Sequence, residues 1–354
     1  MKVLGIDTTA DDTCSAVVED GKTILSSVVF SQSKLHEKFG GIVPQIAAFE
    51  HLKNVLPSVE VALKEAQTDF SGIDLFAVGL SPDPALNYYF ISLNSMKIFS
   101  SVFKKPLIGV DHMEGHIFAN FAEHPDIAFP FVSLTVAGGH TILSFVTDFG
   151  RYEILGQTRD DAAGEAFDKV SRLLMLGYPG GPAIDMASEM GNDSAYDFPR
   201  PMIKDGSFDF SFSGLKTAVW YLVRDLKKRF GEVLPEPIVK DIAASFRRAA
   251  VEVLVDKLFK AAKLKKVNLV VLGGGVAAND LLRREIKTRG ENEGLKVFFP
   301  SKDLCTDNAV GTAIAGYYRF IKCGGDNILA LKHYREKPLM NWDYGLFNKE
   351  KWLR

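Results

Sequence analysis

Apolar and polar positions alternate with period two in the first 30 residues, in three short stretches separated by polar turns. This alternation, with many β-branched residues, is typical of strands, so we expect a β-meander over residues 1–30. The stretch 43–66 instead repeats apolar residues at spacings of three and four, which predicts a helix. Beyond it, we expect strands at "LFAVGLS" and "PLIGVD", with the helix "ALNYYFISLNSMKIFSSVF" between them.

A second meander is predicted at residues 131–155, where apolar strands again surround a small polar turn. After it, the spacing predicts helices around 164–175, 214–230, 237–263 and 278–289, a strand at "VNLVVLGGG" and a helix at "NAVGTAIAGYYRFI". The repeat is weak, but it predicts two lobes that each open with a meander. Alternation of strands and helices indicates an α/β protein with a cleft between the lobes. The segment after residue 323 is polar and looks irregular.

The composition indicates which class of protein this is. A chain of 354 residues is long for one core, and 47% hydrophobic with 24% charged residues is typical of a globular protein. No apolar run approaches the roughly 20 residues that span a bilayer, so no membrane partner is expected. Three cysteines without CxxC spacing favour a reducing compartment. The early aspartates exclude a secretory signal, and we expect a bacterial cytoplasmic protein. A net charge of −2 means that any RNA contact needs a local basic patch or a partner.

Two histidines in "HMEGH", His112 and His116, are four residues apart. On a helix this spacing separates them by about 40°, so both imidazoles project together, as in helices that hold zinc. Glu114 is two residues after His112, and about 200° of rotation directs it away from the pair. A protease-type general base is therefore poorly placed. Two histidines that merely share a helix face are the alternative.

A third ligand candidate is Asp307 in "LCTDNA", at the start of a predicted helix. In one interpretation, Asp307 or Thr306 caps that helix. In the other, Asp307 completes a site of two histidines and one carboxylate, which suits iron(II) or zinc better than magnesium. The residues alone leave both open.

Two glycine-rich turns form a second group of candidate site residues. "VAGGHT" lies between predicted strands, and "VLGGGVAAND" lies between a strand and a helix. Neither carries the lysine of a Walker loop, but each can present backbone N–H groups to a phosphate. The turn "DTTADD" occupies the corresponding position in the first meander.

Acidic residues gather in "RDDAAGEAFDKV", namely Asp161, Glu165 and Asp168, and Asp185 follows a predicted tight turn at 179–182. In one interpretation, these acidic residues cap helices or interact favourably with the first helical turn. In the other, Asp168 and Asp185 accept hydrogen bonds from hydroxyl groups of a ligand. Basic clusters at 224–230, 247–248, 263–266 and 283–289 are either solvated helix faces or a surface for a phosphate backbone.

Together these motifs resemble the TsaD family of tRNA threonylcarbamoyltransferases, over residues 1 to about 325. The resemblance is carried by "HMEGH", "AGGHT", "DDAAGEAFDKV", "GYPGGPAID", "FPRPM", "FSFSGLKTAV", "GGGVAAN" and "LCTDNA". It implies a fold of the actin, Hsp70 and sugar-kinase type, with two duplicated α/β lobes around a nucleotide cleft. The implied domains are 1–110, 111–306, a crossover helix at 307–325 that returns to the first lobe, and a tail at 326–354.

The resemblance also implies an activity. A separate synthase would supply threonylcarbamoyl-adenylate, and this chain would pass the threonylcarbamoyl group to the exocyclic amine of the tRNA adenosine that follows the anticodon, releasing AMP. Expected partners are a TsaB-like paralogue and a TsaE-like ATPase. His112, His116 and Asp307 match the family's metal ligands, for iron(II) or alternatively zinc. Contacts to the adenylate are expected from Thr135, Val136, Ala137, Gly138, Gly139, Asp168, Gly181, Asp185 and Asn279.

Two departures from the family pattern matter. Where the family has a Gly-Pro-Gly-Leu turn, this chain has "SPDPALNYY", so Ser81 and Asp83 replace glycines. Asp83 is expected to add a charge close to a phosphate. The family cysteine of the first turn is Ala10 here, while Asp11 and Asp12 remain; either is a candidate to handle a proton at the amine or an ion bound to a phosphate. Alternatives are a catalytically impaired scaffold or regulator of the same complex, and an ATPase or kinase of the same superfold.

Overall fold

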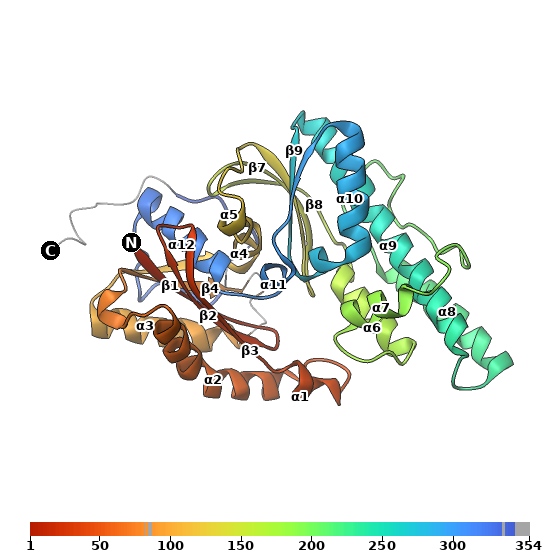
Figure 1. Cartoon of the computed structure of the whole chain (residues 1–354), viewed down its shortest axis with the longest axis horizontal. Helices are drawn as coiled ribbons and strands as arrows, with labels where there is room; N and C mark the ends of the chain where they lie inside the picture. Colours follow the sequence, from red (N-terminus) through yellow and green to blue (C-terminus); the bar gives the residue numbers. More distant parts are fainter. Residues whose placement is uncertain (82, 84–86, 335–336, 344–354) are drawn as a thin grey trace.

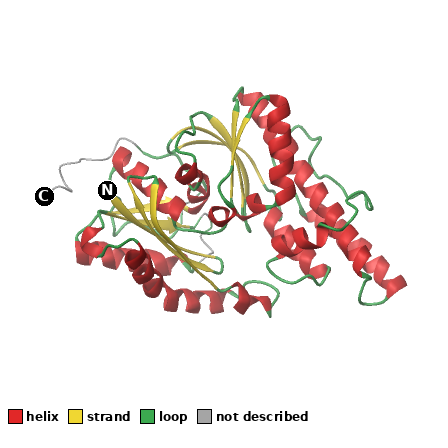
Figure 2. Ribbon diagram, viewed as in Figure 1, coloured by secondary structure: helices red, strands yellow, loops and turns green. Residues whose placement is uncertain are grey.

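Two lobes face each other in the computed structural model, which describes residues 1–81, 83, 87–334 and 337–343 (Figure 1). Each lobe is built on a mixed sheet of five strands, drawn in yellow in Figure 2, with helices packed against it. None of the helices in the described part of the chain has the length and apolar character needed to cross a bilayer.

The N-terminal lobe joins an antiparallel meander to two parallel strands. Its elements are β1 (Lys2–Thr9), β2 (Asp12–Glu19), β3 (Thr23–Ser31), α1 (Ser33–Glu37), α2 (Pro44–Glu65), the 3₁₀ turn η1 (Phe70–Gly72), β4 (Leu75–Leu80), α3 (Tyr89–Phe103) and β5 (Leu107–Asp111). The sheet order is β3-β2-β1-β4-β5, in which β4 runs parallel to β1 and β5 parallel to β4. Alternate residues of β1 serve opposite faces: Leu4 and Ile6 pack with α2 and α3, whereas Val3 packs with the last helix of the chain.

The C-terminal lobe repeats this topology. Its elements are β6 (Phe131–Val136), β7 (Thr141–Asp148), β8 (Arg151–Gln157), α6 (Ala163–Leu173), α7 (Gly180–Ser188), α8 (Ser213–Phe230), α9 (Glu236–Lys265), β9 (Leu269–Gly273), η2 (Gly275–Ala278), α10 (Asp280–Glu293), β10 (Lys296–Phe298) and α11 (Lys302–Cys305). The sheet order β10-β9-β6-β7-β8 again places the fourth strand of the lobe beside the first and the fifth beside the fourth. The predicted pair of meanders and the two-lobed α/β fold are confirmed.

Three helices join the lobes near the centre of Figure 1: α4 (His112–Phe118), α5 (Asn120–Glu123) and α12 (Val310–Cys323). Helix α4 follows β5 directly. Helix α12 packs against α4 and against β1 and β4. The two helices meet through glycines, because a Cβ on Gly311 would overlap the carbonyl oxygen of Gly115. This close approach brings the chain before α12 next to α4.

The predicted elements are found within a few residues, with two informative exceptions. The expected tight turn at 179–182 is instead the first turn of α7, where proline is tolerated and Gly180 packs against the backbone of Asp168. The helix expected to start at Asp307 starts at Val310, and the Asn308 side chain accepts from the Val310 and Gly311 N–H groups. Capping by Asp307 or Thr306 was therefore wrong.

The segment after α12 has no regular helix or strand in its described residues, yet it packs closely. Ser81 donates its N–H to the His333 carbonyl, and Leu339 donates its N–H to Asp111. The buried Trp342 donates its indole N–H to Glu114 at 2.6 Å. This segment therefore ties the N-terminal sheet to α4.

Candidate functional site

Helix α4 carries both histidines of the site. A capping box fixes its start: Asp111 accepts from the Met113 N–H at 2.7 Å, and Glu114 accepts from the Asp111 N–H at 3.3 Å. One turn apart, the rings of His112 and His116 lie with centroids 4.6 Å from each other, and both side chains are buried. Glu114 faces Trp342 and not the histidines, as predicted from its position on the helix.

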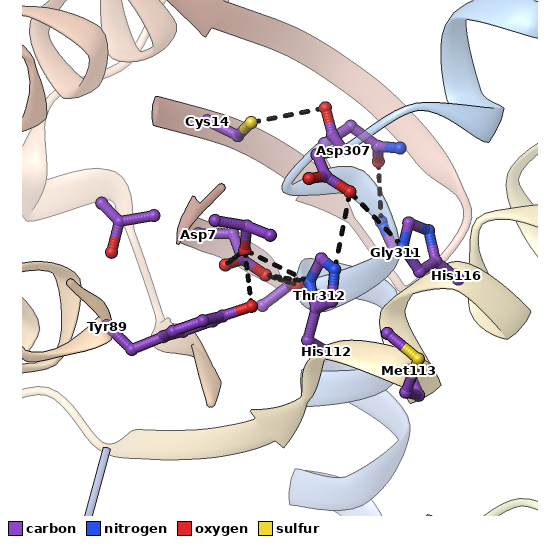
Figure 3. A network of polar contacts seen from close by, with 12 residues as sticks. Asp7, Cys14, Tyr89, His112, Met113, His116, Asp307, Gly311 and Thr312 are labelled. Carbon is purple, nitrogen blue, oxygen red and sulfur yellow. Dashed lines mark hydrogen bonds and ion pairs between the residues drawn. The ribbon is translucent and has the colours of Figure 1, made fainter. Parts of the chain in front are cut away.

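Asp307 approaches the pair from the loop between α11 and α12 (Figure 3). Its Oδ1 atom lies 3.5 Å from His112 Nε2 and 3.4 Å from His116 Nε2. One ligand atom from each of the three side chains lies within 4.8 Å of the other two. The structure thus brings together the two histidines and the carboxylate that are nearly 200 residues apart in the sequence.

These separations fit a metal ion better than direct hydrogen bonds. Hydrogen bonds to imidazole nitrogen are about 2.7–3.2 Å long, shorter than either distance here. Ligand atoms held about 2.1 Å from a tetrahedral ion are about 3.4 Å from one another. His116 Nε2 is buried and has no hydrogen-bond partner among the described residues, which a metal–nitrogen bond would supply. The donor set of two nitrogens and one carboxylate oxygen fits iron(II) or zinc.

Asp7, near the carboxyl end of β1, contacts His112 through the ring nitrogen Nδ1. Its Oδ2 atom lies 3.0 Å from His112 Nδ1, and Thr312 on α12 donates to the same oxygen at 3.4 Å. Gly79 on β4 makes room for this carboxylate, since a Cβ there would overlap it. The sequence interpretation missed Asp7, and the signal that would have found it is a buried aspartate at the carboxyl end of an apolar strand.

Burial and charge set the protonation of the ligands. Burial lowers the pKa of His112, but Asp7 and Asp307 outweigh it, so the pKa lies well above the usual range. Burial and the neighbouring His112 lower the pKa of His116. The two histidines hold the pKa of Asp307 below its ordinary value against the effect of burial. A cation that bound these three side chains would therefore compete with protons for them.

Asp11 lies in the β1–β2 turn and Asp12 begins β2, and both are close enough to Asp307 to respond to its charge. Burial, together with Asp307, raises the pKa of Asp11 to about 6 and that of Asp12 to about 7. The Tyr178 hydroxyl lies 3.4 Å from Asp11. These carboxyl groups titrate near neutral pH, as a proton acceptor requires.

The glycine turns of the C-terminal lobe lie beside the histidines. The turn after β6 is closed by the Ala137 N–H, which donates to the His140 carbonyl at 2.8 Å. A Cβ on Gly138 or Gly139 would meet nothing within 4 Å, so these two glycines border open space. By contrast, a Cβ on Gly274 would overlap the Val136 carbonyl. A Cβ on Gly273 would likewise overlap the His116 carbonyl, so the second glycine turn lies between β6 and α4.

The acidic residues divide into two groups. Asp161 accepts from Lys169 at 2.9 Å and Lys216 at 2.6 Å, and Glu165 pairs with Lys169, so both are used in ion pairs. Asp168 accepts from the Gly180 N–H at 2.7 Å, while Gly181 borders open space.

Asp185 joins Asn279 in a second polar group. Asn279 Nδ2 donates to Asp185 at 2.5 Å, and Arg247 donates to the same oxygen at 3.1 Å. Asn279 also caps α10, accepting from the Leu282 N–H. Burial raises the pKa of Asp185 although Arg247 opposes the change.

The unusual segment 81–89 reaches the same region. Of it, positions 82 and 84–86 lie outside the described residues. Ser81 and Asp83 form a local turn through the Ser81 hydroxyl, and Asp83 is exposed. Burial lowers the pKa of His140 to about 4, and the charge of Asp83 opposes that shift, so Asp83 acts on the residue after the glycine pair.

The basic clusters lie on different helices, α8, α9 and α10, and several of their charges are paired. Lys228 pairs with Asp225, Arg248 with Glu252 and Arg289 with Glu293. No single basic face follows from these positions.

Comparisons with known proteins identify the family of this chain. The family model described as "TsaD: tRNA N6-adenosine threonylcarbamoyltransferase" matches residues 23–314. A protein of that name from Thermodesulfovibrio yellowstonii is 50% identical over 91% of this chain and 95% of its own length. One from Clostridioides difficile is 44% identical over 90% of this chain and 93% of its own.

Solved structures support the fold alone. The nucleotide- and phosphate-bound form of full-length HypF matches with a TM-score of 0.59 at 14% identity, over 92% of this chain and 47% of HypF. Component A of the Acidaminococcus fermentans (R)-2-hydroxyglutaryl-CoA dehydratase matches with a TM-score of 0.54 at 16% identity, over 91% of this chain and all of that one. The fold is of the actin, Hsp70 and sugar-kinase type.

Proposed function

Since this chain belongs to the TsaD family of tRNA N6-adenosine threonylcarbamoyltransferases, we propose that its His112–His116–Asp307 site and the adjoining glycine turns perform that transfer. The observation that carries the proposal is that Asp307 Oδ1 lies 3.5 Å from His112 Nε2 and 3.4 Å from His116 Nε2, with both histidines buried, beside glycines that border open space. The protein is a transferase, and its acceptor is tRNA.

The reaction balances without a covalent enzyme intermediate. The exocyclic amine of the adenosine next to the anticodon attacks the carbamoyl carbon of threonylcarbamoyl-adenylate. A carbon–nitrogen bond forms, the bond from that carbon to the AMP phosphate oxygen breaks, and the amine loses a proton. The protein therefore has to hold the adenylate, orient the amine and accept one proton.

The adenylate would be held by the C-terminal lobe. Backbone N–H groups of the open Gly138–Gly139 turn suit a phosphate, because no side chain blocks their approach. Asp185 and Asn279, already linked to each other, suit the hydroxyls of a ribose. The full proposed set is Thr135, Val136, Ala137, Gly138, Gly139, Asp168, Gly181, Asp185 and Asn279.

Asp11 or Asp12 would accept the amine proton. Both lie near Asp307, and with pKa values of about 6 and 7 either exchanges a proton at neutral pH. Asp83 stays a predicted source of negative charge near the phosphate, supported by its effect on His140.

His112, His116 and Asp307 would hold one divalent ion, iron(II) or alternatively zinc. Such an ion supplies Lewis-acid polarisation of a carbonyl or phosphoryl oxygen. The three side chains fix where that polarisation acts, next to the glycine turn that faces His116.

The remaining partners follow from the family. A separate synthase would supply the adenylate, and a TsaB-like paralogue and a TsaE-like ATPase would assist turnover. Because the acceptor is tRNA, we place the reaction in the cytoplasm. The names of the relatives give no support to a scaffold or to a kinase of the same superfold.

A direct assay tests the function. The purified chain, loaded with iron(II) or zinc and combined with its expected partners, is given threonylcarbamoyl-adenylate and unmodified tRNA. We expect threonylcarbamoyladenosine by mass spectrometry of the digested tRNA, and AMP in equal amount. AMP release without modified nucleoside, from folded and metal-loaded protein, would contradict the proposal.

Metal binding is tested separately. His112→Ala and Asp307→Ala should each lose the ion, because the two remaining ligands bind it much more weakly than three. Elemental analysis after gel filtration measures the loss. His124→Ala is the matched control, since His124 bonds the Phe299 carbonyl away from the site and should keep full occupancy. Full occupancy in both ligand variants would refute the assignment.

A further inference from the structure

The Tyr89 ring lies against the ring of His112, a proposed metal ligand. Tyr89 comes from the segment 81–89, which departs from the family pattern. It is the first residue of α3, only 1% exposed, and its ring meets that of His112 edge-on with centroids 6.1 Å apart. Figure 3 shows its hydroxyl directed toward the Asp7 side of the site. A buried phenol in this place needs a partner for its hydroxyl.

That partner is Thr9, which links Tyr89 to Asp7. Thr9 Oγ1 lies 2.8 Å from the Tyr89 hydroxyl and 2.5 Å from Asp7 Oδ1. A threonine hydroxyl has one proton, so the Thr9 hydroxyl stands between the phenol and the carboxylate and can donate that proton to either of them.

The chain of hydrogen bonds ends on the metal ligand. The other oxygen of Asp7, Oδ2, lies 3.0 Å from His112 Nδ1. Asp7 thus fixes Nδ1 as the ring atom that donates, and Nε2, which lies 3.5 Å from Asp307 Oδ1, is the ring atom available to a metal ion. All four side chains are less than one tenth exposed, so water does not compete for these bonds.

Strand β1 and helix α3 are also fixed to each other at this point. Thr8 donates to the Ser92 hydroxyl at 2.8 Å and lies 3.1 Å from the Tyr88 carbonyl. These contacts hold the first turn of α3, which carries Tyr89, against the end of β1.

We propose that Tyr89 is a positioning residue for His112, acting through Thr9 and Asp7 to hold the imidazole in the orientation and tautomer that bind a metal. The proposal rests on the proposed function of the His112–His116–Asp307 site. It assigns to the altered segment a role in supporting that site.

Metal affinity measures the effect. Zinc and cobalt(II) dissociation constants of the full chain are determined by chelator competition. Tyr89→Phe removes one hydroxyl at constant shape and should weaken binding about 2- to 10-fold, the range of one hydrogen bond. Asp7→Asn should weaken it about 10- to 100-fold. Thr9→Val should weaken it at least as much as Tyr89→Phe, and the double variant should equal Thr9→Val because both changes interrupt one chain of bonds.

Matched variants separate positioning from packing. Thr9→Ser keeps the hydroxyl and should keep the parental constant. Tyr88→Phe removes the neighbouring hydroxyl, which bonds the Ala10 backbone and not Thr9, and should change the constant less than twofold. In the zinc-loaded protein, the Nδ1–H proton resonance of labelled His112 should shift in Tyr89→Phe and not in Tyr88→Phe.

Failure of this proposal differs from failure of the site itself. Parental metal affinity and an unshifted His112 resonance in Tyr89→Phe and Thr9→Val, with metal lost in His112→Ala, would overturn the role of Tyr89 and leave the site standing. Metal retained in His112→Ala would overturn both. Equal weakening in Tyr88→Phe and Tyr89→Phe would show general packing and would also overturn the role of Tyr89.

Discussion

Single residues around the site carry protonation states that their sequence neighbours do not reveal. His51, on α2, is fully buried and lies beside the first turn, with Nδ1 2.8 Å from the Thr13 hydroxyl and Nε2 3.3 Å from the Ala10 carbonyl. Burial lowers the pKa of His51 to about 4, although its bond to the Ala10 carbonyl opposes the shift. His51 is therefore neutral at physiological pH and supports the turn that carries Asp11 and Asp12.

This predicts a loss of stability in acid. The pKa of His51 is lower in the folded state than in the unfolded state, where it is about 6.5. Its contribution is then complete above about pH 6.5 and is lost as the pH falls toward 4, by about 3 kcal/mol. Urea unfolding of metal-free protein from pH 7 to pH 4 should show a smaller loss in His51→Gln than in the parent. An equal slope in both proteins would contradict the assignment.

At the scale of elements, the site depends on how closely α4 and α12 approach. Glycines on both helices let the backbones touch, and Asp307 lies three residues before α12. The same crossing places Thr312 beside Asp7. Metal ligands and helix packing are therefore coupled through this crossing.

Gly311→Ala should separate the two helices, because the added methyl group overlaps the Gly115 carbonyl. Overpacking of this kind costs about 1–3 kcal/mol, and it should also weaken metal binding by moving Asp307 away from the histidines. Thermal unfolding and chelator competition measure the two effects. Gly275→Ala is the control, since a Cβ there meets nothing within 4 Å, and its stability should stay within about 0.5 kcal/mol of the parent. A stable Gly311→Ala with parental affinity would be inconsistent with this coupling.

For the whole molecule, the lobes are joined by chain that crosses between them more than once. Helix α4 leaves the first sheet, α12 returns to it, and the segment after α12 places Trp342 against α4 and the β7–β8 turn. The Trp342 ring stacks on Phe118 at 6.2 Å. The end of the described chain thus secures the helix that carries both histidines.

Trp342→Ala should therefore destabilise the protein by about 3–5 kcal/mol, since it leaves a cavity and removes a partner of the buried Glu114. The change is read as a lower midpoint of thermal unfolding. Trp220→Ala provides the comparison, because Trp220 is 44% exposed and the substitution should cost far less. Equal midpoints for the two variants would count against a structural role for Trp342.

Local patterns were sufficient for most of the fold. Alternation within strands and three- and four-residue spacing within helices depend only on near neighbours, so both meanders and the long helices were predicted from them. The start of α7 was not, because proline and glycine fit both a turn and a first helical turn. The helix geometry of "HMEGH" likewise predicted that the two histidines project together and that Glu114 does not.

By itself, then, the sequence determined the two-lobed α/β fold, the family and the pairing of His112 with His116. The tertiary structure decided that Asp307 faces that pair and does not cap a helix, that Asp7 holds His112, and that Tyr89 stands behind it. The physical reason is range: periodicity and motif spacing are set by residues a few positions apart. The contacts that complete the site join residues up to about 300 positions apart, and these depend on the packing of α3, α4 and α12 around β1.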